Sequence, residues 1–215
     1  MKATNFDQLR RALVERQLES RDIHDSHVIQ AMARVPRHAF VGAKNQRYAY
    51  EDRPLVIGHD QTISQPYIVA LMTQLVEPKP NSIALDVGTG SGYQAAVLAE
   101  IVDRVYSVEI VKPLAKQARK RLHQLGYGNV DIRTGDGYQG WPKHAPFDVI
   151  VLAAAPDHIP QPLIDQLSVG GKLVLPVGQS RQFLTVVEKR DDGSIKKSEL
   201  LPVVFVPMTG EAIGG

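Results

Sequence analysis

The sequence contains no cysteine among its 215 residues. Disulfide bridges, thiolate metal sites and a cysteine nucleophile are therefore excluded. A chain of this length can bury roughly 70% of the surface that its unfolded form exposes, so it needs no covalent staples. We expect one domain spanning residues 1–215 rather than two full domains.

An excess of charge and a long apolar run are also lacking. The 25 basic and 23 acidic residues leave a net charge of only +2, which gives no reason to expect a nucleic-acid or membrane partner. The apolar run from Val149 to Ala155 is too short to span a bilayer, and the polar start, with Asp7 and Arg10, does not resemble a signal peptide. We expect a cytoplasmic protein and favour a monomer.

What the sequence has instead is an alternation of strand-like and helix-like segments from residue 83 onward. The expected strands are Ile83–Val87, Val105–Val108, Val130–Thr134, Phe147–Leu152 and Lys172–Val177, and the expected helices between them are Tyr93–Ile101, Leu114–Leu125 and Ile159–Leu167. This alternation predicts an α/β fold, with a single doubly wound, Rossmann-like, mostly parallel sheet that carries helices on both faces.

Two flanking regions surround this core, which we place at residues 81–178. Residues 1–80 predict an N-terminal helical extension that ends in a helix opened by Pro66, a residue favoured in the first helical turn. Residues 40–64 indicate a loop with a short strand.

Residues 179–215 change character, because no helical pattern separates their two strand-like runs. These runs are Phe183–Lys189 and Leu201–Val206, with a turn at residues 191–194 between them. We expect them to form an antiparallel pair of C-terminal edge strands at the far side of the sheet.

A glycine-rich loop of sequence LDVGTGSG, residues 85–92, follows the first expected strand. Glycines let the backbone turn tightly and approach a ligand, and the helix that follows offers free N–H groups and a partial positive charge. Glu109 ends the next strand 23 residues after Asp86, a spacing that suits the hydroxyls of a ribose. Asp136 follows the third strand, where an acid could accept a hydrogen bond from an adenine amino group.

Taken singly, these features have simpler explanations: a tight connection, a solvated strand end and a turn residue. Together, at successive strand ends, they predict a nucleoside ligand at the carboxyl edge of the sheet. The expected cofactor-binding residues are Asp86, Gly88, Thr89, Gly90, Ser91, Gly92, Glu109, Asp136 and Gly137.

The spacing of the loop indicates which nucleoside. The dinucleotide fingerprint is G-x-G-x-x-G, whereas this loop has G-x-G-x-G with Asp86 two residues before the first glycine. S-adenosylmethionine carries no pyrophosphate but has a cationic amine and a sulfonium, and an acid at the entry of the loop suits a cation. The spacing therefore favours S-adenosylmethionine over NAD.

The glycine loop with Glu109 and Asp136 resembles that of class I methyltransferases. More specifically, the segment QTISQPY at residues 61–67, followed by the loop and Tyr93-Gln94, resembles the protein-L-isoaspartate O-methyltransferases. Further matches are Gly135-Asp136-Gly137, Gly140-Trp141-Pro142, Ala145-Pro146-Phe147-Asp148, Gly170-Gly171, Leu175-Pro176-Val177-Gly178 and Phe205-Val206-Pro207, with Val35-Pro36-Arg37 and Phe40 in the opening helices. The similarity covers nearly the whole chain.

The resemblance implies an enzyme that transfers a methyl group from S-adenosylmethionine, leaving S-adenosylhomocysteine, to the free α-carboxylate of isoaspartyl residues in damaged proteins. It also implies repair, because the methyl ester closes to a succinimide whose hydrolysis returns some normal aspartate. The implied substrate-binding residues are Thr62, Ile63, Ser64 and Gln65, with Ser64 as the catalytic residue that holds the carboxylate. The alternative is a purely structural role, in which Ser64 caps the helix opened by Pro66. None of the seven histidines pairs with an acid at metal-ligand spacing, so we expect no metal.

Two residues depart from the pattern of the family. Asp60 stands where the family usually has glycine, and Leu152 lies near the position where a threonine is expected. Two other functions stay open on residues alone: a methyltransferase for small molecules or nucleic acids, and a nucleotide-binding module without catalysis.

Overall fold

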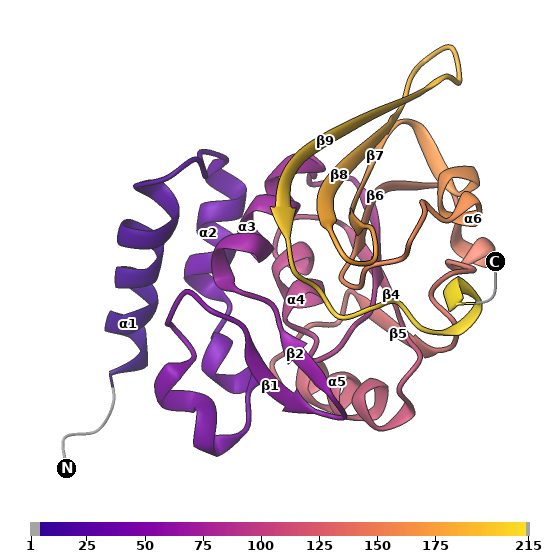
Figure 1. The fold of residues 1–215 in the computed structure, drawn as a ribbon. Helices are drawn as coiled ribbons and strands as arrows, with labels where there is room; N and C mark the ends of the chain where they lie inside the picture. Colours follow the sequence, from indigo (N-terminus) through magenta and orange to yellow (C-terminus); the bar gives the residue numbers. More distant parts are fainter. Residues whose placement is uncertain (1–4, 214–215) are drawn as a thin grey trace.

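A seven-stranded sheet in the order β5-β4-β3-β6-β7-β8-β9 forms the centre of the molecule, in a computed structural model that describes residues 5–213 (Figure 1). Its strands are β3 Ile83–Val87, β4 Arg104–Glu109, β5 Val130–Thr134, β6 Phe147–Leu152, β7 Leu167–Val177, β8 Gln182–Lys189 and β9 Ile195–Val203. The first five of these pair in parallel, and β7, β8 and β9 pair antiparallel. The predicted α/β class and the antiparallel edge are confirmed.

Helices connect the parallel strands. They are α4 Tyr93–Ala99, α5 Lys112–Gln124 and α6 Gln161–Asp165. Strand side chains alternate between the two faces of the sheet, and the buried side chains on each face pack against a helix. Ala84 of β3 and Val149 of β6 belong to the core cluster shared with α4, whereas Leu85 and Ile150 belong to a second cluster shared with α6.

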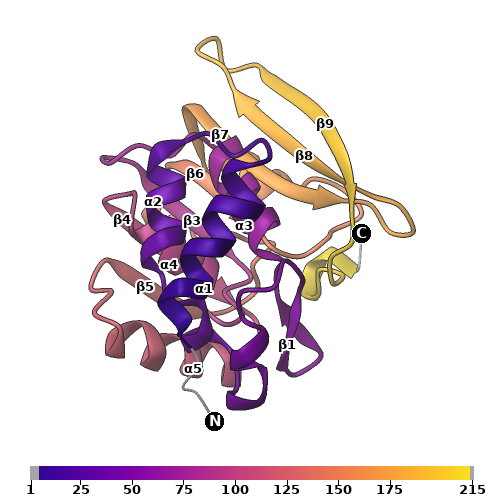
Figure 2. The ribbon, with the colours of Figure 1, turned by 90° about the vertical axis from the view of Figure 1, so that its left-hand side faces the viewer.

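The N-terminal part adds a layer outside the sheet. Its elements are α1 Phe6–Leu13, a π-helical stretch η1 Val14–Glu19, α2 Ser26–Arg34, the 3-10 turns η2 Arg37–Phe40 and η3 Ala43–Tyr48, the hairpin of β1 Leu55–Gly58 and β2 Gln61–Ile63, and α3 Pro66–Leu75. Figures 1 and 2 show α1 and α2 on the outer side of α3 and α4, away from the sheet. The short strand predicted within residues 40–64 is thus one half of a hairpin.

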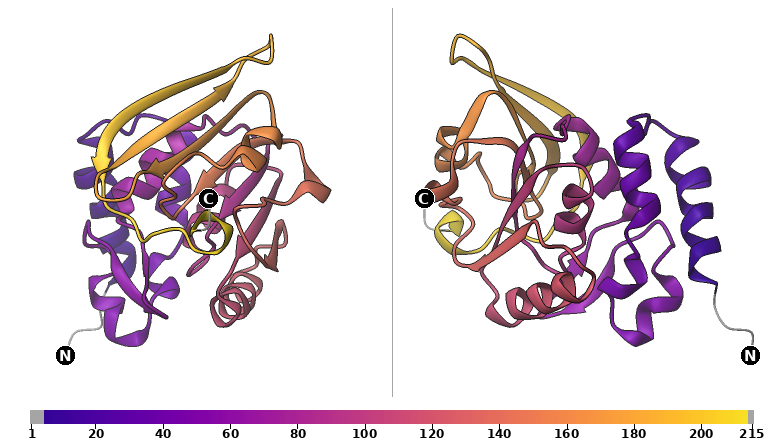
Figure 3. Two further views of the ribbon diagram at one scale, coloured as in Figure 1. Left: turned by 45° about the vertical axis from the view of Figure 1, so that its right-hand side comes forward. Right: turned by 180° about the vertical axis from the view of Figure 1, so that it is seen from behind.

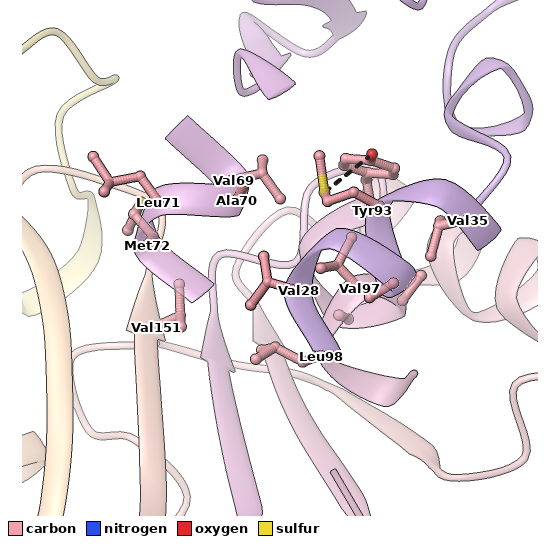
Figure 4. Close-up of a cluster of buried hydrophobic side chains, with 14 of the residues drawn as sticks. Val28, Val35, Val69, Ala70, Leu71, Met72, Tyr93, Val97, Leu98 and Val151 are labelled. Atoms are coloured by element: carbon pink, nitrogen blue, oxygen red, sulfur yellow. Dashed lines mark hydrogen bonds between the residues drawn. The ribbon is translucent and has the colours of Figure 1, made fainter. Parts of the chain in front are cut away.

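Apolar side chains join this outer layer to the sheet (Figure 4). Val28 of α2, Met72 of α3, Leu98 of α4 and Val151 of β6 are each at most 1% exposed and lie in one cluster. Burying side chains of this size stabilises a fold by about 1.5–3 kcal/mol each, so the N-terminal helices are anchored on the sheet side by packing.

The second edge strand lies earlier than the sequence pattern predicts. The apolar pattern predicts it at residues 201–206, whereas β9 spans Ile195–Val203. Its pairing with β8 begins where Ile195 lies opposite Lys189. Its first half is polar and exposed, with Lys196 and Lys197, so the apolar pattern missed it. Figure 3 shows from two sides that this hairpin extends beyond the rest of the sheet.

Two further elements are short 3-10 turns, η4 Pro142–His144 and η5 Gly210–Ile213. The predicted helix at residues 159–167 is confirmed only over α6, because Leu167 already begins β7. Across the described residues 5–213, no helix combines the length and the apolar character needed to cross a membrane.

Candidate active site

The glycine loop joins the end of β3 to the start of α4. Gly88, Gly90 and Gly92 have φ values of +88°, +52° and +90°, a left-handed conformation that other residues rarely adopt without strain. Gly92 is also the N-cap of α4, and a Cβ there would lie 3.2 Å from the side chain of Leu122. The alternating glycines of the motif are therefore required by the path of the backbone.

Glu109, at the end of β4, fastens this loop. Its Oε2 accepts a hydrogen bond of 2.7 Å from the backbone N–H of Gly90, and its Oε1 accepts one of 2.8 Å from that of Val111. The side chain is nearly buried, at 5% exposure, and lies in the wall of the cavity described below. Because each carboxylate oxygen can accept more than one hydrogen bond, Glu109 keeps acceptor capacity for a ligand.

Asp86 lies beneath the loop and is fully buried. Its Oδ2 accepts a 2.7 Å hydrogen bond from the Ser107 hydroxyl, which in turn accepts one from the hydroxyl of Thr89. Within residues 5–213 its Oδ1 has no hydrogen-bond partner. Burial raises the pKa of Asp86 to about 7, with a further rise from Glu109 and an opposing effect from the Ser107 hydrogen bond. The site thus holds a carboxyl group that titrates near neutral pH.

Asp136 is engaged by the backbone around it. Its Oδ1 accepts a hydrogen bond of 2.9 Å from the N–H of Tyr138, and its Oδ2 accepts one of 2.8 Å from the N–H of Glu211. The next residue, Gly137, approaches β3 so closely that a Cβ there would lie 2.5 Å from Val87. Contact of Asp136 with an adenine stays a prediction.

A cavity of about 780 Å³ opens at the carboxyl edge of the sheet, a size usual for small-molecule sites. Its wall contains residues from both predicted sets, the cofactor-binding residues and the substrate-binding residues. The predicted residues in its wall are Thr62, Ile63, Ser64, Gln65, Gly88, Thr89, Gly90, Ser91, Glu109 and Gly137. Asp86, Gly92 and Asp136 support this wall from behind rather than line it.

The predicted substrate segment reaches the cavity between β2 and α3. Gln65 is the N-cap of α3 but makes no side-chain capping hydrogen bond. The cap comes from Asp52 instead, whose Oδ1 accepts a 3.0 Å hydrogen bond from the N–H of Tyr67, and whose Oδ2 accepts one of 2.8 Å from the Gln65 side chain. Capping by Ser64 is thus unnecessary for this helix.

Part of the cavity wall comes from the segment of residues 201–209, which the sequence does not predict to belong to the site. The yellow strand end and loop in Figure 1 show it crossing the edge of the sheet after β9. The Gln182 side chain exchanges two hydrogen bonds with the backbone of Phe205, and Ala155 bonds both Val206 and Met208 through its backbone at 2.8 Å. The apolar pattern that predicts a strand here therefore also reflects the contribution of these residues to the cavity wall.

Neither departure from the family pattern reaches the cavity wall. Asp60 is exposed in the turn between β1 and β2 with a φ of +57°, which explains why glycine suits this position. Leu152 is fully buried in the core, and the next two residues, Ala153 and Ala154, line the cavity in its place.

Comparisons with known proteins agree on one family. A family model described as protein-L-isoaspartate(D-aspartate) O-methyltransferase matches residues 8–213. The protein-L-isoaspartate O-methyltransferase of Gloeobacter violaceus is 56% identical over 200 residues, which cover 93% of this chain and 98% of the relative. Protein-L-isoaspartate O-methyltransferase 2 of Syntrophobacter fumaroxidans is 58% identical over 188 residues, covering 86% and 76%.

Two solved structures extend the similarity to the fold. One, described as a protein-L-isoaspartate O-methyltransferase, is 28% identical with a TM-score of 0.85 and matches 96% of this chain and 66% of its own. The other, a Plasmodium falciparum structure described as an enzyme of this kind in complex with S-adenosyl-L-homocysteine, is 29% identical with a TM-score of 0.81, covering 96% and 99%. The chain belongs to the protein-L-isoaspartate(D-aspartate) O-methyltransferase family.

Proposed function

We propose that this enzyme transfers a methyl group from S-adenosylmethionine to the free α-carboxylate of L-isoaspartyl residues in damaged proteins and peptides, which begins their repair. The observation that carries the proposal is the shared cavity. Its wall includes the glycine loop and Glu109 as well as Thr62 to Gln65. We assign the cofactor to the core, residues 81–178, and the substrate to the extension, residues 1–80.

The residues present fit S-adenosylmethionine in three respects. Backbone at the left-handed glycines offers room for close approach, Glu109 offers acceptor oxygens, and Asp86, at the start of the loop, keeps one oxygen without a hydrogen-bond partner among residues 5–213. A cation above this loop would favour the ionised form of Asp86. When bound, S-adenosylmethionine supplies a methyl group on a positively charged sulfur that leaves as a neutral thioether.

The protein's own residues supply positioning rather than proton transfer. A carboxyl group with an ordinary pKa near ~4 is already ionised at pH 7, so no general base is needed. With S-adenosylmethionine bound, the ionised substrate oxygen would take the methyl group, and the electron pair of the carbon–sulfur bond would stay on sulfur. Holding two reactants in line in a site shielded from water can contribute roughly 7–11 kcal/mol.

Ser64 and Thr62 are the proposed holders of the substrate carboxylate. A hydroxyl donates one hydrogen bond to an anion without forming the ion pair that would weaken it as a nucleophile. Ser64 is half-buried in the cavity wall and Thr62 is exposed beside it. This arrangement suits a substrate that enters from solvent and a reacting oxygen that is held inside.

The deciding experiment is transfer of label from S-adenosylmethionine to an isoaspartyl peptide, with the matching aspartyl peptide as the control. Labelling of the isoaspartyl peptide alone is the expected result. Equal labelling of both peptides would end the isoaspartyl assignment, and labelling of neither, with cofactor binding intact, would favour a different methyl acceptor. Calorimetry that detects no uptake of S-adenosylmethionine or its demethylated product would remove the methyltransferase assignment altogether.

The finer properties of the enzyme are proposals as well. We infer a cytoplasmic monomer that takes damaged proteins and no nucleic acid. The small net charge of +2 supports the last of these, because it gives no basic surface for a nucleic acid. Light scattering after size exclusion tests the monomer. Competition of the methylation assay with duplex DNA and with RNA tests the absence of nucleic-acid binding.

A further inference from the structure

Arg37, in the turn η2, is a fully buried arginine beside the substrate segment. Its Nε donates a 2.8 Å hydrogen bond to the carbonyl of Ala49, and its Nη2 donates one of 2.7 Å to the carbonyl of Ser64. The guanidinium carbon lies 4.8 Å from the centre of the Tyr93 ring. One side chain therefore ties the segment that holds the proposed catalytic serine to the start of α4.

In the described part of the chain, no carboxylate lies within ion-pair distance of Arg37, since the nearby Asp52 pairs with Arg21 instead. The Nη1 of Arg37 is buried without a hydrogen-bond partner there. Burial lowers the pKa of Arg37 to about 10, although Tyr93 and Asp52 favour its charged form. The group still carries a full charge at neutral pH. Removing a cation from water is costly unless an anion or good hydrogen bonds compensate it.

The position of this charge relative to the cavity indicates its use. Ser64 and Tyr93, which Arg37 contacts, both line the cavity, whereas Arg37 itself lies one layer behind them. An anion bound at Ser64 would face the positive charge of Arg37, which Asp52 balances only from a distance, across low-dielectric material where such attraction is stronger than in water. The proposed substrate group is such an anion, a carboxylate.

The cofactor side of the cavity has a comparable clamp. Arg121 of α5 donates a 2.6 Å hydrogen bond from Nη1 to the carbonyl of Ser91 in the glycine loop. It is half-buried, and its guanidinium carbon lies 5.9 Å from the centre of the Phe40 ring. Each half of the cavity is thus held by an arginine bonded to a backbone carbonyl of its wall.

We propose that Arg37 is the positioning residue for the substrate carboxylate, acting through Ser64: it fixes the carbonyl of Ser64 and provides the positive potential that favours an anion beside it. The inference rests on the proposed function, because the anion is the isoaspartyl carboxylate. A purely structural role, in which Arg37 only ties η2 and η3 to the start of α3, is the competing explanation. The two differ in which kinetic constant changes.

The test compares R37K and R37Q with the matched control R121K in the full-length enzyme. Lysine keeps the charge but cannot donate to two carbonyls in the fork geometry of arginine, and glutamine removes the charge. We expect the KM for an isoaspartyl peptide to rise about tenfold in R37K and up to about a hundredfold in R37Q. Calorimetric affinity for S-adenosylhomocysteine should stay within about twofold in both. R121K should show the reverse, with weaker cofactor binding and an unchanged peptide KM at saturating cofactor.

Two results would overturn the inference while leaving the enzyme assignment intact. One is a folded R37K and R37Q pair with an unchanged peptide KM, and the other is a loss of cofactor affinity that equals the loss of peptide affinity. Failure of the proposed function is distinguishable, because the wild-type enzyme would then leave the isoaspartyl peptide unmethylated.

The wild-type protein supplies a second test if both variants fail to fold. The Nε–H of Arg37 is bonded and shielded from water, so it gives a slowly exchanging signal in nitrogen-15 NMR. In the presence of S-adenosylhomocysteine, addition of the isoaspartyl peptide should shift this signal, and the aspartyl peptide should not. A signal that neither peptide moves would refute the role.

Discussion

We expect Asp86 to make the unliganded enzyme less stable as the pH rises, and its replacement by asparagine to remove this contribution. The side chain is fully buried, one of its oxygens has no hydrogen-bond partner among residues 5–213, and burial raises its pKa from 3.8 to about 7. The unfolded chain therefore releases the proton near pH 4, whereas the native protein keeps it until about pH 7. Where the native state binds more protons than the unfolded state, stability falls with rising pH.

The size of the effect follows from the two pKa values. The contribution of Asp86 is fully present below pH 4, is lost progressively between about pH 4 and pH 7, and stays lost above that range. Each pH unit of difference corresponds to about 1.4 kcal/mol. Between pH 5 and pH 8 the wild-type enzyme should therefore lose about 3 kcal/mol of unfolding free energy through this group.

The assay is urea denaturation of the ligand-free wild type and of D86N at pH 5, 6, 7 and 8. The unfolding free energy of D86N relative to that of the wild type should rise by about 3 kcal/mol across this range. D103N, which makes the same substitution at an exposed position, should follow the wild type. Equal pH dependence in D86N and the wild type would show that Asp86 is ionised in the native protein well below pH 7, which would refute the reasoning.

Three further outcomes test the assignment of the site. S64A should lower turnover of an isoaspartyl peptide and leave the calorimetric affinity for S-adenosylhomocysteine nearly unchanged; a large loss of that affinity would contradict the division of the cavity. E109Q should weaken cofactor binding by about 1.5–3 kcal/mol in the same titration, the scale of hydrogen bonds to a charged group, and an unchanged affinity would exclude Glu109 from the ribose site. D60G should leave the peptide KM within about twofold, because Asp60 is exposed outside the cavity wall; a large drop in KM would mean that its carboxylate repels the substrate.

The parallel core could be predicted because strands buried on both faces form continuous apolar runs. The runs at Ile83–Val87 and Phe147–Leu152 coincide with β3 and β6 to the residue. Edge strand β9 could not be placed in this way, since Lys196 and Lys197 face solvent and carry no apolar signal. The apolar residues 201–206 that follow predict a strand, and β9 does include the first three of them, but all six line the cavity and the last three lie beyond the end of β9.

The site shows the same division between local and distant determinants. Gly88, Gly90 and Gly92 could be recognised because a left-handed backbone selects glycine within a short motif. The roles of Arg37 and Asp52 depend on contacts with residues that are distant in the sequence, and no local spacing encodes such contacts. Pro36-Arg37 was part of the family resemblance, but only the fold indicates what the guanidinium touches.

The position of residues 201–209 in the cavity wall has a consequence for synthesis of the chain. The ribosome releases the glycine loop first, and at ~5–20 residues per second the wall follows on the order of ten seconds later. Until then the nucleoside site lacks one side, so binding energy cannot help the nascent sheet to fold. The strands on either side of Asp86 therefore pair and pack before the nucleoside site is complete.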